Sequence, residues 1–217
     1  IVTLYHFEYP VGLVEQYGGW LSRKSIDDYV NYATLLFKTY GDRVKYWITV
    51  NEQDHVVHMP FRLGLKENDL KENEKAGFLA NHNMCVAAAK AIEVCHRLIP
   101  NGKIGPSFAF SPIYAFSSKP EDVLALENVE EISNYWWLDV YCWGEYPKIA
   151  WKYLSKLGLA PTIEAGDIEL LKAGKPDFMG VNYYRSGTVE MNPLEGGVEE
   201  AVAKMNTTGK KGTTAES

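Results

Sequence analysis

The sequence predicts an α/β fold in which parallel strands alternate with helices. Two observations support this class. Apolar, β-branched runs of strand length recur at residues 1–6, 44–50, 103–110 and 177–184, and segments with helical spacing of apolar residues separate them. Strands that alternate with helices pair in parallel, because each helical crossover returns the chain to the same end of the sheet.

The first half of the chain supplies two of these strands. Residues 1–6 form a run typical of a strand buried on both faces. Ser25 begins a Ser-x-x-Asp start signal for a helix that ends at Gly41. Residues 44–50 predict the second strand, and after a longer loop the apolar spacing predicts a helix over 75–98.

The second half continues the same alternation. Residues 103–110 predict a third strand, weakened by its Gly-Pro pair, and residues 177–184 predict the fourth. No internal repeat or shift in composition marks a second domain, so we expect one partial catalytic domain over residues 1–217. Three helices lie between these strands, predicted over 120–143, 148–157 and 163–173.

The spacing of these units favours a (β/α)8 barrel. Four strand–helix units average ~45 residues each, so eight would need ~370 residues, within the range of decorated barrels. A doubly wound open sheet is the alternative, but no GxGxxG or Walker-type phosphate loop follows any strand. Four strands of a barrel would leave two parallel edges open, which predicts self-association through those edges.

The two ends of the chain suggest a piece of something larger. The chain begins inside a predicted strand, without methionine, and it ends in a polar stretch rich in Gly, Thr and Lys. Neither end resembles the boundary of a domain, so we expect the central part of a longer protein.

Composition excludes several classes of function. The 217 residues carry 22 basic and 28 acidic side chains, a net charge of −6, which argues against coating duplex nucleic acid or an anionic membrane, because either role needs a basic face. No run approaches the ~18 apolar residues of a membrane span. The cysteines Cys85, Cys95 and Cys142 form no CxxC pair, which argues against a disulfide framework or a zinc knuckle and indicates a reducing, cytoplasmic compartment.

Polar side chains follow three of the predicted strands, at residues 6–8, 51–53 and 182–184. In a parallel barrel the reactive groups lie at the carboxyl ends of the strands. Glu52 is the strongest candidate, because the apolar strand before it would place its carboxyl group against apolar walls and favour the protonated form that a general acid needs. The structural alternative is a solvated glutamate in a loop.

The remaining strand-end residues are candidates for binding a substrate. Asn51 and His6 could form hydrogen bonds to substrate hydroxyls, and Asn182 and Tyr184 could contact substrate or orient a second carboxylate. Their structural alternatives are a histidine satisfied in the core and a polar cap at the end of a strand. The tryptophans and the 14 tyrosines offer stacking surfaces, but large aromatic side chains more often pack in the core.

A second constellation, at His55 and His58, could bind a metal ion. Glu52 and Asp54 adjoin these histidines, and two histidines three residues apart share a face when the segment is helical. However, Pro60 follows at once and the segment is predicted to be a loop. A metal-dependent barrel hydrolase that uses His55 and His58 is therefore an alternative function, and we expect no metal site.

These strand ends and the motifs around them resemble glycoside hydrolase family 1, the family of β-glucosidases and 6-phospho-β-glucosidases. The resemblance runs over nearly the whole chain in the family's order. Its motifs are Leu4-Tyr-His-Phe-Glu-Tyr-Pro10, Tyr17-Gly-Gly-Trp20 with Arg23, Phe37 to Tyr40, Val44-Lys-Tyr-Trp-Ile-Thr-Val-Asn-Glu52, Asn81-His82-Asn83, Gly144-Glu-Tyr-Pro147 and Asp177-Phe-Met-Gly-Val-Asn-Tyr-Tyr184.

The resemblance implies that this chain holds strands three to six of a (β/α)8 barrel, in a retaining β-glycosidase that needs no cofactor. By position, the acid/base glutamate of the family falls on Glu52, and the asparagine that contacts the sugar 2-hydroxyl falls on Asn51. The histidine after the third barrel strand falls on His6. The tyrosine that bonds to the nucleophile falls on Tyr184, with Asn182 beside it in the wall of the site.

Two departures from the β-glucosidase pattern are similar to the phosphoglycosidase branch of the family. The sequence has His6-Phe7-Glu8 where His-Trp-Asp is usual, and Asn51-Glu52-Gln53 where Asn-Glu-Pro is usual. These departures imply that the substrates are 6-phospho-β-glucosides, used in carbohydrate catabolism.

The resemblance also implies that one catalytic carboxylate lies outside this chain. Retention needs a nucleophilic carboxylate about 5–5.5 Å from the acid/base group. The family carries it in a Glu-Asn-Gly motif after strand seven, and the sequence has no such motif. We therefore expect residues 1–217 alone to be inactive; a non-catalytic sugar-binding fragment is the further alternative.

Overall fold

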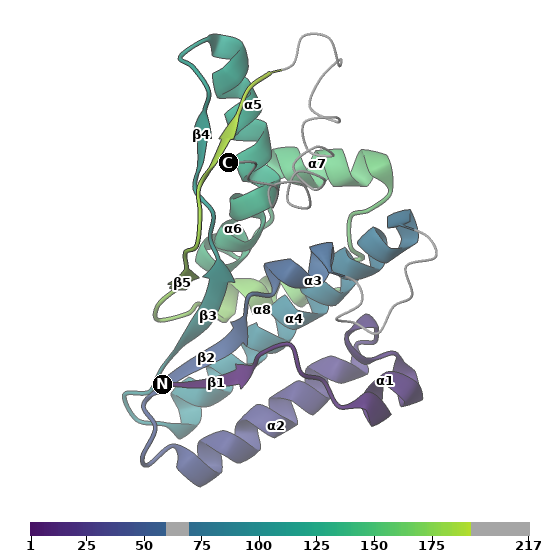
Figure 1. The fold of residues 1–217 in the computed structure, drawn as a ribbon. Coiled ribbons are helices and arrows are strands. Elements are labelled where there is room, and N and C mark those ends of the chain that lie inside the picture. The colour runs from purple at the N-terminus through teal and green to yellow at the C-terminus, as the bar shows by residue number, and fades with distance from the viewer. Residues whose placement is uncertain (60–69, 192–217) are drawn as a thin grey trace, which may run out of the picture.

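A four-stranded sheet lies at the centre of the computed structural model, which describes residues 1–59 and 70–191 (Figure 1). Its strands are all parallel and follow the order β1–β2–β3–β5. Strands that follow one another in both sequence and space form the wall of a barrel, so the predicted class is confirmed. The strands of this sheet are β1 (Val2–Tyr5), β2 (Tyr46–Asn51), β3 (Lys103–Ala109) and β5 (Gly180–Asn182).

Helices connect these strands and cover the sheet (Figure 1). The helices predicted from Ser25 to Gly41 and over 75–98, 148–157 and 163–173 are confirmed with shifted bounds, and the helix predicted over 120–143 is divided into α5, η3 and α6. The helices are α1 (Val11–Tyr17), α2 (Lys24–Tyr40), α3 (Asp54–His58), α4 (Leu70–Leu98), α5 (Pro120–Glu130), α6 (Trp136–Trp143), α7 (Lys148–Leu157) and α8 (Asp167–Ala173), with the short turns η1 (Gly19–Leu21) and η3 (Glu131–Tyr135).

Helix α2 packs against β2 through its apolar stripe. The ring of Phe37 meets the ring of Trp47 edge to face, with centroids 5.0 Å apart, and both side chains are buried. The Tyr29 hydroxyl donates to the Thr49 carbonyl at 2.7 Å, so the polar end of this buried ring is also satisfied. These contacts fix the height of the helix along the strand.

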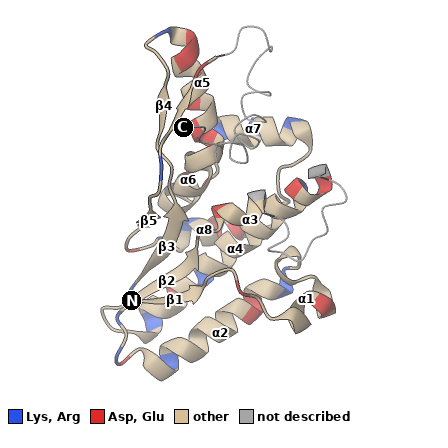
Figure 2. Cartoon of the chain, viewed as in Figure 1, with Lys and Arg blue, Asp and Glu red and all other residues tan. Residues whose placement is uncertain are grey.

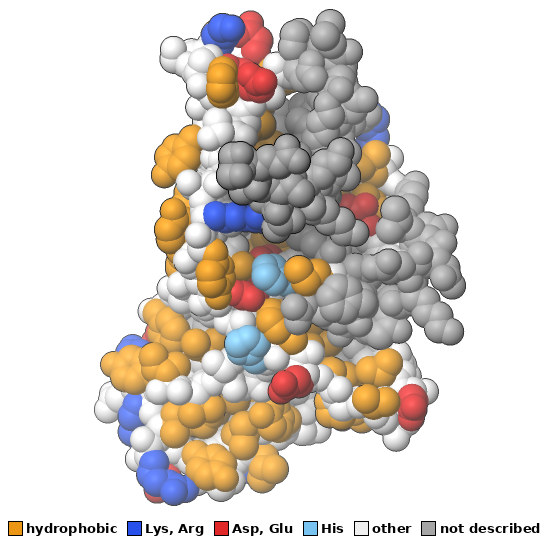
Figure 3. Space-filling model, in the orientation of Figure 1, with side chains coloured by type: hydrophobic (Ala, Val, Ile, Leu, Met, Phe, Trp, Pro, Cys, Tyr) orange, Lys and Arg blue, Asp and Glu red, His pale blue; other side chains and the backbone are white. Residues whose placement is uncertain are grey.

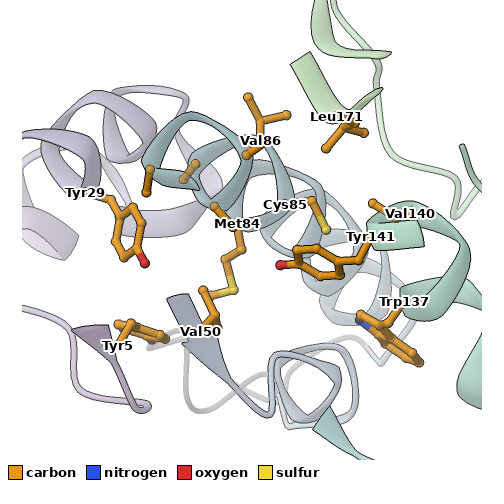
Figure 4. Packing of buried hydrophobic residues seen from close by; sticks show 14 of the residues in the cluster. Tyr5, Tyr29, Val50, Met84, Cys85, Val86, Trp137, Val140, Tyr141 and Leu171 are labelled. Atoms are coloured by element: carbon orange, nitrogen blue, oxygen red, sulfur yellow. The ribbon is translucent and has the colours of Figure 1, made fainter. Parts of the chain in front are cut away.

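Helix α4 passes through the middle of the molecule and is buried on most of its sides. Its buried surface is rich in alanine, which lets neighbouring helices approach closely. A Cβ atom on Gly174, just after α8, would lie 2.4 Å from the Cβ of Ala89, so only glycine fits there. Figure 4 shows side chains from several elements meeting around this helix: Tyr5, Tyr29, Val50, Met84, Cys85 and Tyr141.

Some local predictions were wrong. Ser25 does not cap α2, because the helix already begins at Lys24 and the Ser25 hydroxyl donates to the Ser22 carbonyl at 2.6 Å. The segment after Glu52, predicted to be a loop, forms the short helix α3. The helix predicted over 120–143 is interrupted by η3, a π-helical turn.

The structure also has a second, two-stranded parallel sheet that the sequence did not predict. It pairs β4 (Ile113–Ala115) with β6 (Gly187–Val189), which continue the chain beyond β3 and β5. Three-residue strands carry too few side chains to show a period of two. Oε1 of Glu130, at the end of α5, accepts a hydrogen bond from the Ile113 amide at 3.0 Å, which joins this sheet to α5.

Strand β3 forms in full despite its Gly-Pro pair. The ladder with β2 shifts its register between Gly105 and Ser107, so Pro106 lies where the regular pairing is already interrupted. A Cβ atom on Gly105 would lie 1.9 Å from the carbonyl oxygen of Phe178, just before β5. Gly105 is therefore accommodated by the close approach of the chain before β5, and Pro106 by the register shift in the pairing with β2.

Charged residues are distributed over helices and loops, and in the view of Figure 2 basic and acidic residues are interspersed. Within residues 1–59 and 70–191, no helix has both the length and the apolar composition required to cross a bilayer.

The core around β2 predicts a large cost for losing one side chain. We expect Trp47→Ala to lower the free energy of unfolding by about 3–5 kcal/mol, because a fully buried indole leaves a cavity that its neighbours cannot fill. Its neighbour Tyr46 is 52% exposed, and Tyr46→Ala should cost less than about 1 kcal/mol. Urea unfolding followed by circular dichroism measures both values, and equal losses would contradict the assignment of the core.

Candidate active site

The carboxyl ends of the four central strands meet at one edge of the sheet. The register places Asn51 of β2 opposite Ser107 of β3, and Ala109 of β3 opposite Asn182 of β5. His6 directly follows β1 at the same edge. Residues far apart in the sequence are therefore brought together, as the barrel topology predicts.

Glu52 lies at the point where the chain leaves β2. Its φ angle is 48°, in the left-handed region that residues other than glycine rarely adopt. Its amide donates to the Ser107 carbonyl at 2.8 Å, which holds this conformation against the neighbouring strand. The pairing of β2 with β3 shifts its register just before Glu52. This shift and the left-handed backbone set the direction of the Glu52 side chain, which is only 8% exposed.

The amide of Asn182 connects the ends of β5 and β2. Its Nδ2 donates to Oε1 of Glu52 at 2.8 Å and to Oδ1 of Asn51 at 3.0 Å. Its own Oδ1 accepts from the Ser107 hydroxyl at 3.2 Å. Asn182 therefore orients one oxygen of Glu52 and ties the ends of β2, β3 and β5 together.

Asn51 extends this network to the end of β1. Its Nδ2 lies 3.1 Å from Nε2 of His6, and because an amide N–H can only donate, the ring nitrogen is the acceptor. Asn51 is buried, whereas His6 is exposed at the surface. The network therefore runs from a buried amide to a side chain that a ligand can reach.

Helix α3 places two further titratable groups beside Glu52. The His55 amide donates to the Glu52 carbonyl at 3.0 Å, which begins the helix and brings the His55 side chain back over Glu52. Nδ1 of His55 lies 3.5 Å from Oε2 of Glu52. Nε2 of His55 lies 3.7 Å from Oδ2 of Asp54.

The environment of Asp54 alters its ionisation. Burial raises the pKa of Asp54 to about 6, and the nearby negative charge of Glu52 acts in the same direction. His55 and the Ala109 amide, which donates to Oδ1 at 3.3 Å, oppose this rise. Asp54 therefore keeps its proton to a higher pH than an ordinary aspartate does.

Gln53 fixes the turn after Glu52 from below. Its side chain is fully buried, its Oε1 accepts from the Tyr141 hydroxyl at 2.5 Å, and its Nε2 lies 3.1 Å from the Cys85 sulfur. The Asn81 amide donates to its carbonyl at 3.4 Å. These bonds hold in place the residue that directly follows Glu52.

Four of the five predicted site residues lie together: His6, Asn51, Glu52 and Asn182. The fifth, Tyr184, follows β5, and its side chain is 79% exposed. Sequence reasoning gave no role in the site to Ser107, Gln53 or His55 beyond the metal hypothesis. The spacing of Glu52 and His55, three residues apart, is a signal that could have identified the last of these if the segment had been expected to be helical.

The metal-site hypothesis gains no support from the described residues. Within them, no group of three or more His, Cys, Asp or Glu side chains is placed to hold a metal ion. The side chain of His58 lies outside the described part of the structure.

Several of the quoted motifs form a buried support behind the sheet and not part of the site. His82 is fully buried; its Nδ1 lies 2.8 Å from the Tyr146 hydroxyl and its Nε2 lies 2.9 Å from Oδ2 of Asp167. Arg23 binds the same carboxylate through two nitrogens, at 2.6 and 3.0 Å. Although burial opposes it, these partners hold the pKa of Asp167 below its ordinary value.

The surface above the strand ends combines polar and apolar groups. In Figure 3, histidine and acidic side chains emerge in the same central region, flanked by hydrophobic side chains. Such a combination is typical of sites for small polar ligands, where a few polar groups fix orientation.

Comparisons with known proteins identify relatives of this chain. The model of glycosyl hydrolase family 1 matches residues 1–217. The chain is 52% identical over 216 residues to the aryl-phospho-β-D-glucosidase BglC of Bacillus subtilis (strain 168), covering 100% of this chain and 44% of that protein. It is 38% identical over 193 residues to a 6-phospho-β-glucosidase of Dickeya chrysanthemi, covering 87% of this chain and 40% of that protein.

Solved structures give the same result. A β-glucosidase from Thermotoga maritima in complex with deoxynojirimycin matches with a TM-score of 0.76 and 31% identity, over 89% of this chain and 43% of that chain. The chain thus spans less than half the length of the relatives it matches.

The raised pKa of Asp54 predicts a specific dependence of stability on pH. Because its pKa is higher in the folded state, protonated Asp54 favours folding below about pH 4, and that contribution is lost as pH rises through 6. Relative to Asp54→Asn, which cannot titrate, the wild-type chain should lose about 2–4 kcal/mol between pH 4 and pH 7. Urea unfolding at several pH values measures this difference.

Asp42→Asn, which removes one negative charge from the surface, is the matched control for net charge. If the free energies of unfolding of Asp54→Asn and the wild-type chain change equally with pH, the pKa of Asp54 is not raised in the folded state.

Proposed function

Because the chain belongs to glycosyl hydrolase family 1, as its motifs predict, we propose that it provides the acid/base half of the active site of a retaining β-glycosidase. The observation that carries this proposal is the pair of bonds from Asn182 Nδ2 to Glu52 Oε1 and Asn51 Oδ1, at 2.8 and 3.0 Å. These bonds hold one buried carboxyl group at the strand ends, with polar side chains beside it that suit a sugar.

We propose 6-phospho-β-glucosides as the substrates. The names of two relatives support this, an aryl-phospho-β-D-glucosidase and a 6-phospho-β-glucosidase. The two departures from the β-glucosidase pattern, at His6-Phe7-Glu8 and Asn51-Glu52-Gln53, are consistent with the same branch.

The proposed reaction has two steps. In the first, Glu52 gives its proton to the glycosidic oxygen while a carboxylate from outside this chain attacks the anomeric carbon; the aglycone leaves and a covalent glycosyl intermediate forms. In the second, ionised Glu52 takes a proton from a water molecule, which attacks the same carbon and releases the sugar. Glu52 ends the cycle protonated, as it began.

The other predicted residues position the sugar in this scheme. Asn51 would meet the 2-hydroxyl and His6 a neighbouring hydroxyl, and such bonds can strengthen in the transition state. Tyr184, exposed after β5, would bond to the nucleophile contributed by the next strand of a complete barrel. Asn182 would orient Glu52 in both steps.

The proposal predicts which substitution abolishes the reaction. In the full-length protein that carries this chain, Glu52→Gln should lower kcat/KM for an aryl 6-phospho-β-glucoside by about 10²–10⁴-fold, because the amide cannot transfer a proton. Removing the 6-phosphate from the substrate should lower kcat/KM for the wild-type enzyme. Release of the chromophore measures both effects.

Glu190→Gln, which changes an exposed carboxylate after β6, is the control and should leave the rate unchanged. Residues 1–217 alone should release no aglycone, since they carry half of the carboxylate pair. Turnover by residues 1–217 that depends on Glu52 would contradict this proposal, and sugar binding without turnover by the full-length protein would favour a non-catalytic role.

We also propose a cytoplasmic location. Cys85, Cys95 and Cys142 are all free thiols, as expected of a chain kept in a reducing compartment.

The open strands β1 and β5 predict association of residues 1–217 with themselves. Each is an edge of a parallel sheet whose outer backbone groups can pair with another strand. Sedimentation velocity should show oligomers that increase with concentration. The double variant Val2→Lys/Val181→Lys, at exposed positions of the two edges, should shift the population toward monomer, whereas a wild-type chain that stays monomeric at high concentration would contradict this prediction.

A further inference from the structure

The imidazole of His55 lies between two acidic side chains at the candidate site. Nδ1 faces Oε2 of Glu52 at 3.5 Å, and Nε2 faces Oδ2 of Asp54 at 3.7 Å. In the charged form of histidine both ring nitrogens are donors, so one ring can serve both carboxyl groups. Asn182 donates to the other oxygen of Glu52, Oε1, at 2.8 Å.

Two contacts from other elements keep the ring in this place. Phe7, which follows β1, stacks on His55 with the ring planes 2° apart and the centroids 6.0 Å apart. Asp54 is itself held to β3 by the Ala109 amide, which donates to Oδ1 at 3.3 Å and leaves Oδ2 toward the ring. The side chain of His55 is 30% exposed, so these contacts do not enclose it fully.

From this arrangement we propose that His55 is a positioning residue for the acid/base group of the reaction. It faces Oε2 of Glu52 while Asn182 holds Oε1, and an N–H group of its ring, directed at Oε2, stabilises the carboxylate that remains after Glu52 has given up its proton. The inference rests on the proposed function, in which Glu52 is the acid/base carboxyl group.

The role requires no proton transfer to or from His55. In the first step the proton leaves Glu52 for the glycosidic oxygen, and in the second Glu52 regains a proton from water; the imidazole keeps its own protons throughout. Asp54 presents Oδ2 to the other ring nitrogen, Nε2, at 3.7 Å, which helps to fix the orientation of the ring.

Other elements near the ring contribute uncharged groups. From β5, Asn182 donates to Glu52, and from β3, the Ala109 amide donates to Asp54. Helix α4 approaches α3 at Gly77, where a Cβ atom would lie 2.9 Å from the Cα of Val57. Among the described residues, Glu52 and Asp54 are the acidic groups within ion-pair distance of His55. Replacing His55 should therefore slow the step in which Glu52 transfers its proton.

The experiment compares two aglycones in the full-length protein. A 2,4-dinitrophenyl group leaves without protonation, whereas a methyl group needs the proton of Glu52. His55→Phe keeps a ring against Phe7 but removes both nitrogens, so kcat/KM should fall roughly 10–100-fold for the methyl 6-phospho-β-glucoside and less than about threefold for the dinitrophenyl substrate. His55→Asn, which can present an amide N–H toward Glu52, should recover part of the loss.

His96→Phe is the matched control, because His96 lies far from the strand ends in an ion pair with Asp177, and it should leave both values unchanged. Equal losses on both substrates, or no loss on either, would overturn the positioning role; thermal unfolding shows whether a variant has failed to fold. If Glu52→Gln retains wild-type activity, the proposed function fails instead, whatever His55 does.

Discussion

The register of the parallel strands is the constraint on which the rest of this structure depends. Because Asn51 pairs with Ser107 and Ala109 with Asn182, the ends of β2, β3 and β5 lie level with one another. One amide side chain can then reach two residues on another strand. A shift of one residue in any of these pairings would turn the side chains to the other face of the sheet and separate the group.

Most of the central sheet could be predicted from the sequence, because it depends on long apolar runs and on their alternation with helices. The order of the strands follows from the rule that consecutive units lie side by side. What the sequence did not show are features set by tertiary contacts, such as the short strands β4 and β6 and the helix α3. A five-residue helix has no period to detect, and α3 exists because Gln53 and Glu52 are held at its start.

The site was predicted in part and for two different reasons. Glu52, Asn51, His6 and Asn182 could be identified as candidates because each lies at the end of a predicted strand. The resemblance of the sequence to a known family then assigned them roles. The contacts of His55 with Glu52 and Asp54 could not be read in the same way, since they depend on a left-handed residue that turns the chain back over itself. Tyr184 has its proposed partner beyond this chain, so its role could be assigned by resemblance alone.

The π-helical turn η3 has a consequence for the floor of the site. A turn with one extra residue rotates everything after it by about 100° relative to a regular helix. That rotation determines the face from which α6 presents Tyr141, whose hydroxyl bonds to Gln53 beneath the acid/base residue. Deleting one residue from Glu131–Tyr135 would thus turn this phenol away from Gln53 and loosen the support beneath the acid/base residue, although neither α5 nor α6 would lose a residue.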